Sequence, residues 1–311
     1  MRIITNLTAG LDIFSALNSK VRINIIKLLN SKHKLSFSDL AKNLDISIST
    51  LTPHIKKLEK AGIIEVKLSM DEKYPAKVCT LIENKIIIEI IPEHPEYKSF
   101  EFDIDVGKYF DYNVTPTCGL ASAKKLIGSL DDPRYFSHPE RFDAGIIWFT
   151  QGYVEYRIPN LLTINEKPEE VQITCELCSE APGVISHFPS DIYFIVNGIN
   201  LGYWTSPGEL FDRKGRYTPD WWFQNFPQYG RIKVITVNHT GTYLDGLLLS
   251  PVTVSDLNMS KCSDISVKIE IPENAKNIGG ITLFGKGFGD YDVGIKVKVL
   301  YKNGEKEKAD L

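Results

Sequence analysis

Three lysines lie close together in the segment STLTPHIKKLEKAGII, which spans residues 49–64. At helical spacing Lys56, Lys57 and Lys60 share one face, where their ammonium groups can neutralise the phosphates of a nucleic acid. Polar side chains precede these lysines in the chain and can reach base edges or phosphates. They are the hydroxyls of Ser47, Ser49, Thr50 and Thr52 and the imidazole of His54. This order is typical of a recognition helix in a major groove, and a solvated basic helix is the alternative.

The other face of the same segment is apolar at helical spacing, which predicts packing against earlier helices. Its members are Ile48, Leu51, Ile55 and Leu58. Residues 11–29 repeat that spacing, and SFSDLAKNL offers Ser36 and Ser38 as helix caps. A tight turn is expected at Asp45. We therefore expect short amphipathic helices before the basic segment.

Two strands joined by a polar loop are predicted after the basic segment. GIIEVKL and KVCTLI are the strands, and SMDEKYPA connects them. Helices followed by such a hairpin form a winged helix-turn-helix.

Pro53 lies inside the predicted basic helix. A proline removes one backbone hydrogen bond there, and its ring crowds the carbonyl four residues earlier. Several N–H groups are unpaired in the first turns of any helix, so the proline is compatible with this position. Its ring could also meet a thymine methyl group. We expect an irregular helix start over residues 49–53.

The runs FSALNSKVRINIIKLL and LSFSDLAKNLDISISTLTPHIKKLEKAGII resemble the ArsR-type winged-helix regulators over roughly the first 90 residues. The resemblance implies that Ser49, Thr50, Thr52 and His54 face the groove of double-stranded DNA. It implies that the wing around residues 71–74, with Lys73, approaches the flanking backbone. It also implies a homodimer on a pseudo-palindromic operator.

The sequence departs from that family at two places. Pro53 stands where arginine is common, so a guanine contact worth about 1–3 kcal/mol is missing. No Cys-x-Cys precedes the turn, so metal sensing is not expected.

Charge and aromatic content divide the 311 residues into two parts. Residues 1–90 hold 14 Lys and Arg against 9 Asp and Glu, whereas the remainder holds 22 against 30, and all four Trp lie in the remainder. Pro92 and Pro95 interrupt the pattern between them. The sequence predicts two domains, residues 1–91 and 92–311.

The overall composition is that of a soluble globular protein, with 43% hydrophobic and 24% charged residues and a net charge of −3. The most apolar run, at residues 86–91, is too short to span a membrane, and no secretion signal is recognised, so a cytoplasmic protein is expected. Cys175 and Cys178 fall on a predicted strand and point to opposite faces, which favours free thiols over a metal site. No cofactor is expected.

The second part contains many short segments with alternating polarity, separated by turns such as Asn197-Gly198. The segments are residues 99–105, 144–158, 169–177, 190–204, 230–238, 265–272 and 293–301. They predict an all-β antiparallel sandwich or jelly roll, and the whole chain is therefore an α+β multidomain protein. This part resembles β-sandwich domains attached to ArsR-like regulators and, in architecture, galactose-binding-like sandwiches, which implies a sugar or oligosaccharide as ligand.

A long turn-rich segment, residues 201–230, combines aromatic and charged side chains. Sugars stack on aromatic rings through their C–H faces and need polar partners for their hydroxyls. The candidate ligand residues are Trp204, Asp212, Arg213, Arg216, Trp221 and Trp222, with Arg157 and Asp245 as further members of a pocket. The alternative is that the tryptophans close the open end of the sandwich, as Trp148 is expected to belong to the core.

Enzymatic motifs are weak. GGITLFGKG has nearly the spacing of a phosphate-binding loop, but Gly287 replaces the required Ser or Thr and a strand follows. The acid pairs Asp131-Asp132 and Asp290/Asp292 could serve glycoside hydrolysis or bind calcium, but they are more typical of turns. We expect a ligand-responsive transcriptional regulator and not an enzyme. The alternative is a carbohydrate-binding or carbohydrate-active sandwich protein with an appended helical domain.

Overall fold

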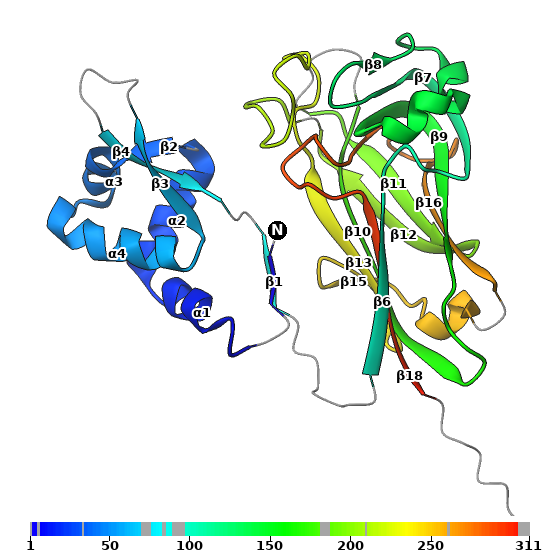
Figure 1. Cartoon of the computed structure of the whole chain (residues 1–311), viewed down its shortest axis with the longest axis horizontal. Coiled ribbons are helices and arrows are strands. Elements are labelled where there is room, and N and C mark those ends of the chain that lie inside the picture. Colours follow the sequence, from blue (N-terminus) through cyan, green and yellow to red (C-terminus); the bar gives the residue numbers. More distant parts are fainter. Residues whose placement is uncertain are drawn as a thin grey trace, which may run out of the picture. The chain divides into compact units, whose positions relative to one another are not determined.

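The computed structural model describes residues 2–4, 7–32, 34–69, 76–82, 85–88, 97–180, 187–208, 210–259 and 262–303. The chain divides into two compact units, Met1–Glu93 and His94–Leu311 (Figure 1). The predicted boundary after residue 91 lies in 89–96, outside the described residues. The predicted α+β class, a winged helix followed by an antiparallel β-sandwich, is confirmed.

The described residues of the first unit form four helices and a three-stranded sheet that build a winged helix, plus one further strand pair. The helices are α1 (Leu11–Leu17), α2 (Lys20–Lys32), α3 (Phe37–Leu44) and α4 (Ile48–Lys60). The antiparallel sheet has the order β2 (Lys34–Ser36), β4 (Ala76–Leu81) and β3 (Ile64–Ser69). A separate parallel pair joins β1 (Arg2–Ile4) to β5 (Ile86–Ile88).

Local sequence signals explain where these helices begin and end. Ser36 caps α3, since its Oγ accepts a hydrogen bond from the backbone N–H of Asp39, as predicted. Asp45 ends α3 in the left-handed conformation at φ 52°, also as predicted. The apolar run at residues 11–29 lies on two short helices, because Asn18 leaves the helical conformation and caps α1.

The core of the first unit is formed by the apolar faces of the helices. Leu51, Ile55 and Leu58 of α4 are buried, as the spacing predicted. Ile48 is 51% exposed, contrary to the expectation that it packs with them. Ile48 is the first residue of α4, and helical side chains point toward the N-terminus of their helix. Its side chain therefore extends past the end of α4 and is not covered by the core.

The second unit is made almost entirely of antiparallel strands. Those in the first half are β6 (Tyr97–Ile104), β7 (Asp111–Ala121), β8 (Leu126–Ile127), β9 (Ile146–Pro159), β10 (Glu166–Cys178), β11 (Ser190–Val196) and β12 (Ile199–Ser206). Those in the second half are β13 (Arg231–Asn238), β14 (Gly241–Leu244), β15 (Leu247–Ser250), β16 (Asp264–Ile271), β17 (Ile281–Phe284) and β18 (Ile295–Asn303). Short 3-10 helices are η1 (Pro133–Ser137), η2 (Pro139–Asp143) and η3 (Val254–Leu257).

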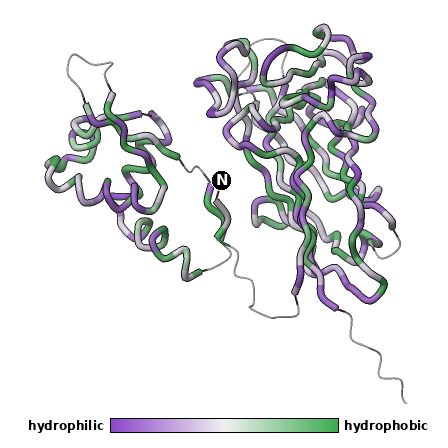
Figure 2. Tube along the Cα trace, in the orientation of Figure 1, coloured by the Kyte–Doolittle hydropathy of each residue, from purple (hydrophilic) through white to green (hydrophobic). Residues whose placement is uncertain are grey.

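The strands form two runs that share one core. One run has the order β12-β11-β16-β9-β7-β8, and the other has the order β6-β18-β10-β13-β14-β15. Strand β17 pairs with both β9 and β10 and so joins the runs. Alternate residues of β16 are buried, and Figure 2 shows the matching change of polarity along the strands. Both runs contribute to the main apolar core between them.

Several sequence signals of the sandwich are confirmed. Asn197 and Gly198, both at positive φ, turn the chain between β11 and β12. Cys175 joins the main core and Cys178 joins a second apolar cluster, so the two free thiols do lie on opposite faces of β10. The longest described helices have 13 residues, and none of the described helices is long and apolar enough to cross a membrane.

Candidate nucleic-acid interface and sandwich loops

The outward face of α4 carries polar and basic side chains over its whole length. Ser49, Thr50, Pro53, Lys56 and Lys57 are exposed, while the opposite face is buried in the core of the first unit. Among the described residues, Lys56 and Lys57 form no ion pair, so their ammonium groups are available to an anion. We call the face formed by these five residues the basic face of α4.

Hydroxyl groups fix the beginning of α4. Ser47 is the N-cap, and its Oγ accepts from the backbone N–H of Thr50 at 3.1 Å. The hydroxyls of Ser49 and Thr50 lie 2.7 and 2.8 Å from the same Oγ, and Thr52 donates to the carbonyl of Ile48 at 2.7 Å. These hydroxyls therefore shape the helix start as well as facing outward.

The helix runs through Pro53 without a break, so the expected irregularity over residues 49–53 is wrong. The capping hydrogen bonds of Ser47 hold the first turn. The proline removes only the bond that residue 53 would donate to the carbonyl of Ser49, and its ring projects into solvent.

His54 is half-buried and does not simply face outward. Its Nδ1 lies 3.3 Å from Nη1 of Arg22, a buried residue of α2. Burial lowers the pKa of His54, and the positive charges of Arg22 and Lys57 lower it further. The expectation that His54 simply faces the groove needs correction. The Nδ1 edge of its ring is directed to Arg22 of α2, and only the Nε2 edge is open.

Lys60 lies beside an acid. Its Nζ is 2.9 Å from Oδ1 of Asp12 in α1, and the two side chains are 72% and 58% exposed. An exposed pair of this kind contributes little to stability but lowers the positive charge at this end of α4. Lys73 and the loop at residues 70–75 lie outside the described residues.

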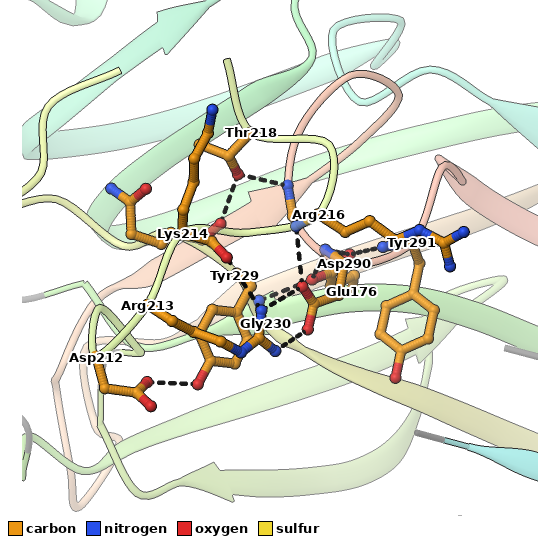
Figure 3. Close-up of polar contacts among 12 residues, drawn as sticks. Glu176, Asp212, Arg213, Lys214, Arg216, Thr218, Tyr229, Gly230, Asp290 and Tyr291 are labelled. Carbon is orange, nitrogen blue, oxygen red and sulfur yellow. Dashed lines mark hydrogen bonds and ion pairs between the residues drawn. The ribbon is translucent and has the colours of Figure 1, made fainter. Parts of the chain in front are cut away.

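The turn-rich segment of the sandwich is anchored by a buried polar cluster (Figure 3). Arg213 donates two hydrogen bonds to Asp290, from Nη1 to Oδ1 at 2.9 Å and from Nη2 to Oδ2 at 2.5 Å. Its guanidinium also lies 3.8 Å from the ring centroid of Tyr229, whose hydroxyl donates to Asp212 at 2.5 Å. Arg213 thus holds this segment in place, which contradicts its assignment to an open ligand site, whereas Asp212 is exposed and its assignment stays a prediction.

Glu176 of β10 lies at the centre of the same cluster and is fully buried. Its carboxylate accepts hydrogen bonds from the backbone N–H groups of Gly230, Asp290 and Tyr291, at 2.8 to 2.9 Å. Burial raises the pKa of Glu176 to about 8, against the lowering effect of these N–H groups. No sequence signal indicated this role, because alternation along β10 places Glu176 opposite the residues of the main core.

The tryptophans of the segment have different surroundings. Trp222 is only 4% exposed, its ring packs on Trp148 and Phe288, and its Nε1 donates to the carbonyl of Pro227. Trp222 is therefore core, like Trp148, and the proposal that it contacts a ligand is wrong. Trp221 is half-buried at the surface and donates to the carbonyl of Ala123 at 2.8 Å.

Three of the remaining predicted ligand residues, Trp204, Asp245 and Arg157, have partners outside the polar cluster of Arg213 and Asp290. Trp204 and Asp245 are brought together by Lys233, whose Nζ lies 4.2 Å from the Trp204 ring centroid and 2.8 Å from Oδ2 of Asp245. Arg157 stacks on Phe110 at 3.8 Å and pairs with Glu155 and Asp264. The exposed Arg216 lies near Tyr217, and its backbone N–H donates to Asp290. The eight residues thus fall into four sets: Asp212, Arg213 and Arg216 in the polar cluster, Trp221 and Trp222 in an aromatic cluster, Trp204 and Asp245 around Lys233, and Arg157 beside Phe110.

Residues 21–84 match the family described as a winged helix DNA-binding domain. No curated protein matches the chain. The chain is similar to the CBM36-1 domain of a multidomain xylanase from the hindgut metagenome of Trinervitermes trinervoides, with 8% identity, a TM-score of 0.28 and coverage of 64% of this chain and 96% of that chain.

Two further solved structures are similar to it. One is the carbohydrate-binding module CBM36 in complex with calcium and xylotriose, with 10% identity, a TM-score of 0.27 and coverage of 65% and 98%. The other is winged bean acidic lectin complexed with methyl-α-D-galactose, with 11% identity, a TM-score of 0.29 and coverage of 68% and 100%. At these TM-scores the similarities carry no conclusion about a ligand of this chain.

Proposed function

We propose that this protein is a ligand-responsive transcriptional regulator that binds double-stranded DNA through α4. The single observation that carries the proposal is the basic face of α4, exposed on a helix whose other face is buried in a winged helix. Lys56 and Lys57 contact phosphates, while Ser49 and Thr50 reach base edges in the major groove.

The proposal includes a homodimer on a pseudo-palindromic operator, by analogy with ArsR-type regulators. A two-fold dimer places two copies of α4 one helical turn of DNA apart, which doubles the number of phosphate contacts. Binding to DNA is then steeply dependent on salt.

The experiment is selection of duplexes from a random library with the full-length protein, followed by fluorescence anisotropy of the enriched duplex. We expect an enriched inverted repeat, a stoichiometry of two chains per duplex, and an affinity that falls steeply between 50 and 200 mM salt, by about 10³-fold or more for a dimer with at least six phosphate contacts. Enrichment of no sequence, together with a flat salt dependence, would exclude a regulator.

We also propose that the sandwich binds a small effector, of which a sugar or oligosaccharide is the leading class, and that it has no catalytic activity. The support is the aromatic surface that remains on the turn-rich segment. Trp221 is half-buried there, and Tyr217 and Phe223 are 37% and 42% exposed. The exposed Arg216 adds a polar partner beside Tyr217.

A thermal-shift screen of mono- and oligosaccharides tests the effector. A binding sugar raises the unfolding temperature of the wild type, and Trp221→Ala is expected to abolish that rise. The matched control is Phe110→Ala, since Phe110 is an exposed aromatic residue with a different set of partners. No shift for any sugar would exclude this ligand class while leaving DNA binding intact.

A further inference from the structure

Arg22 of α2 is buried although it carries a permanent charge. Its Nε donates to the carbonyl of Ala16 at 2.5 Å, and its Nη2 donates to the carbonyls of Ser15 and Asn18 at 3.0 and 3.1 Å. These carbonyls belong to the last turn and cap of α1, where helix geometry leaves oxygens unpaired. The other terminal nitrogen, Nη1, lies 3.3 Å from Nδ1 of His54. One side chain therefore joins the end of α1 to α4.

The chemistry of this contact fixes the position of the proton on His54. A guanidinium offers only donors, so Nδ1 of His54 must accept from Nη1 of Arg22. In a neutral imidazole one nitrogen accepts and the other carries the hydrogen, which places the hydrogen on Nε2. The lowered pKa of His54 is consistent with a neutral ring at pH 7.

The second nitrogen of the ring is directed away from Arg22. Nδ1 and Nε2 lie on different edges of an imidazole, and the Nδ1 edge faces the buried guanidinium. Within the described part of the chain, no acceptor is hydrogen-bonded to Nε2. Thr50 and Lys57, one helical turn before and after His54, are exposed on the basic face of α4. The Nε2–H thus borders that face.

We propose that Arg22 is a positioning residue that holds His54 in the Nε2–H form, so that His54 donates this hydrogen to an acceptor on duplex DNA. The inference rests on the proposed DNA binding and adds to it a specific donor and the residue that orients it. The acceptor is an unprotonated oxygen or nitrogen, supplied by a backbone phosphate or by the major-groove edge of a purine.

The tautomer is tested without DNA. Long-range proton–nitrogen NMR spectra of the ¹⁵N-labelled full-length protein at pH 7 are expected to show Nδ1 of His54 as an unprotonated nitrogen and Nε2 as protonated. The resonances are assigned by their disappearance in His54→Asn. Arg22→Lys removes the planar donor, and the His54 signals are expected to move toward the average of the two tautomers. A protonated Nδ1 in the wild type, or an unchanged spectrum in a folded Arg22→Lys protein, would overturn the positioning role.

The DNA contact is tested with a matched pair of variants on the enriched duplex. An asparagine oxygen can take the place of Nδ1, so His54→Asn keeps an acceptor for Arg22 but loses the outer donor. A glutamine amide reaches the place of Nε2, so His54→Gln keeps the donor. We expect His54→Asn to bind about tenfold more weakly than the wild type and His54→Gln to stay within about threefold, since a dimer loses two hydrogen bonds of about 0.5–1.5 kcal/mol each and a tenfold change corresponds to about 1.4 kcal/mol. Urea unfolding confirms that both variants are folded.

Substitutions in the DNA identify the acceptor. Duplexes with single 7-deazapurines remove one major-groove nitrogen, and duplexes with single methylphosphonates neutralise one phosphate. One of these DNA substitutions is expected to lower the affinity of the wild type for the duplex and to leave the affinity of His54→Asn unchanged. The substituted atom is then the acceptor for the Nε2–H of His54. If His54→Asn binds an enriched duplex as tightly as the wild type, this inference fails and the proposed function stands. If no duplex is enriched, the proposed DNA binding and the proposed contact of His54 with DNA both fail. The NMR spectra then still decide which tautomer His54 adopts.

Discussion

Arg213 and Asp290 form a two-point ion pair between segments that lie 77 residues apart in the chain. The carboxylate side chain is 6% exposed and the guanidinium side chain 27% exposed, so the pair is largely removed from water. Asp290 also accepts from the backbone N–H of Arg216, and its own N–H donates to Glu176. The turn-rich segment is therefore fastened to β10 and to the loop before β18 through charged groups.

The first prediction concerns this ion pair. Asp290→Asn leaves the guanidinium of Arg213 in a mostly buried place without its counter-charge, and it is expected to lower the free energy of unfolding by about 3 kcal/mol. Equilibrium urea unfolding measures the change. Asp220→Asn is the matched control, because Asp220 is fully exposed in its pair with Lys214, and its unfolding midpoint should not move. Equal stability of wild type and Asp290→Asn would contradict the anchoring role.

The second prediction is a pH dependence caused by Glu176. The pKa is about 8 in the folded chain and near 4.5 in the unfolded chain, so the unfolded chain loses its proton first as pH rises. The stabilisation from Glu176 is present below pH 4.5 and is lost progressively as pH approaches 8, by at most about 1.4 kcal/mol per pH unit. Urea unfolding from pH 5 to pH 9 measures this slope.

Glu176→Gln supplies the comparison for that slope. The amide does not ionise, so the difference in stability between wild type and variant isolates the contribution of Glu176 from that of the histidines. The amide nitrogen also replaces an acceptor that faces backbone N–H groups, so the variant is expected to be less stable by about 1–3 kcal/mol at pH 5. Parallel pH profiles for the two proteins would show that Glu176 has an ordinary pKa.

The fold of both units was largely predictable from local signals. The spacing of Leu51, Ile55 and Leu58, the cap at Ser36 and the left-handed turn at Asp45 are consequences of short-range chemistry, which the sequence displays directly. Alternation of polarity likewise predicted most of the long strands, but the short β17, which joins the two runs, has no such pattern.

The candidate sites were less predictable, because they depend on contacts between distant residues. Arg22 and His54 are 32 residues apart, and nothing in either local sequence shows that they meet. Glu176 occupies an alternate position of β10 and would face solvent if residues 210–230 and 285–291 did not cover it. Trp222 has the residue type of a sugar platform, yet the same covering segment folds it into the core.

The third prediction concerns the proline of α4. Pro53→Ala restores one backbone hydrogen bond, to the carbonyl of Ser49, and removes the steric conflict of the ring. It is therefore expected to stabilise the first unit by up to about 3 kcal/mol. Thermal unfolding monitored by circular dichroism at 222 nm reports the helices. Thr52→Ala is a control on the same turn, since it keeps the proline and removes only a hydroxyl contact. A stability below that of the wild type would mean that the ring has a packing role.

The fourth prediction separates two aromatic neighbours. Trp222→Ala removes a buried indole from the cluster around Trp148 and is expected to cost about 3–5 kcal/mol of unfolding free energy. Trp221→Ala should cost much less, because Trp221 is only half-buried. Urea unfolding of both variants makes the comparison. If the two costs were equal, the assignment of Trp222 to the core and Trp221 to the surface would be untenable.

The fifth prediction tests whether the basic face of α4 meets phosphates. Lys56→Ala and Lys57→Ala each remove one exposed ammonium group and leave the buried face of α4 unchanged. Each is expected to weaken binding to all duplexes alike and to reduce the slope of log affinity against log salt by about 1 for every phosphate that the variant no longer neutralises. Lys124→Ala, an exposed lysine of the second unit, is the control and should leave the slope unchanged. If the duplex still bound with an unaltered salt slope after both α4 lysines were removed, other residues would neutralise the phosphates, and the proposed role of the basic face of α4 would be wrong.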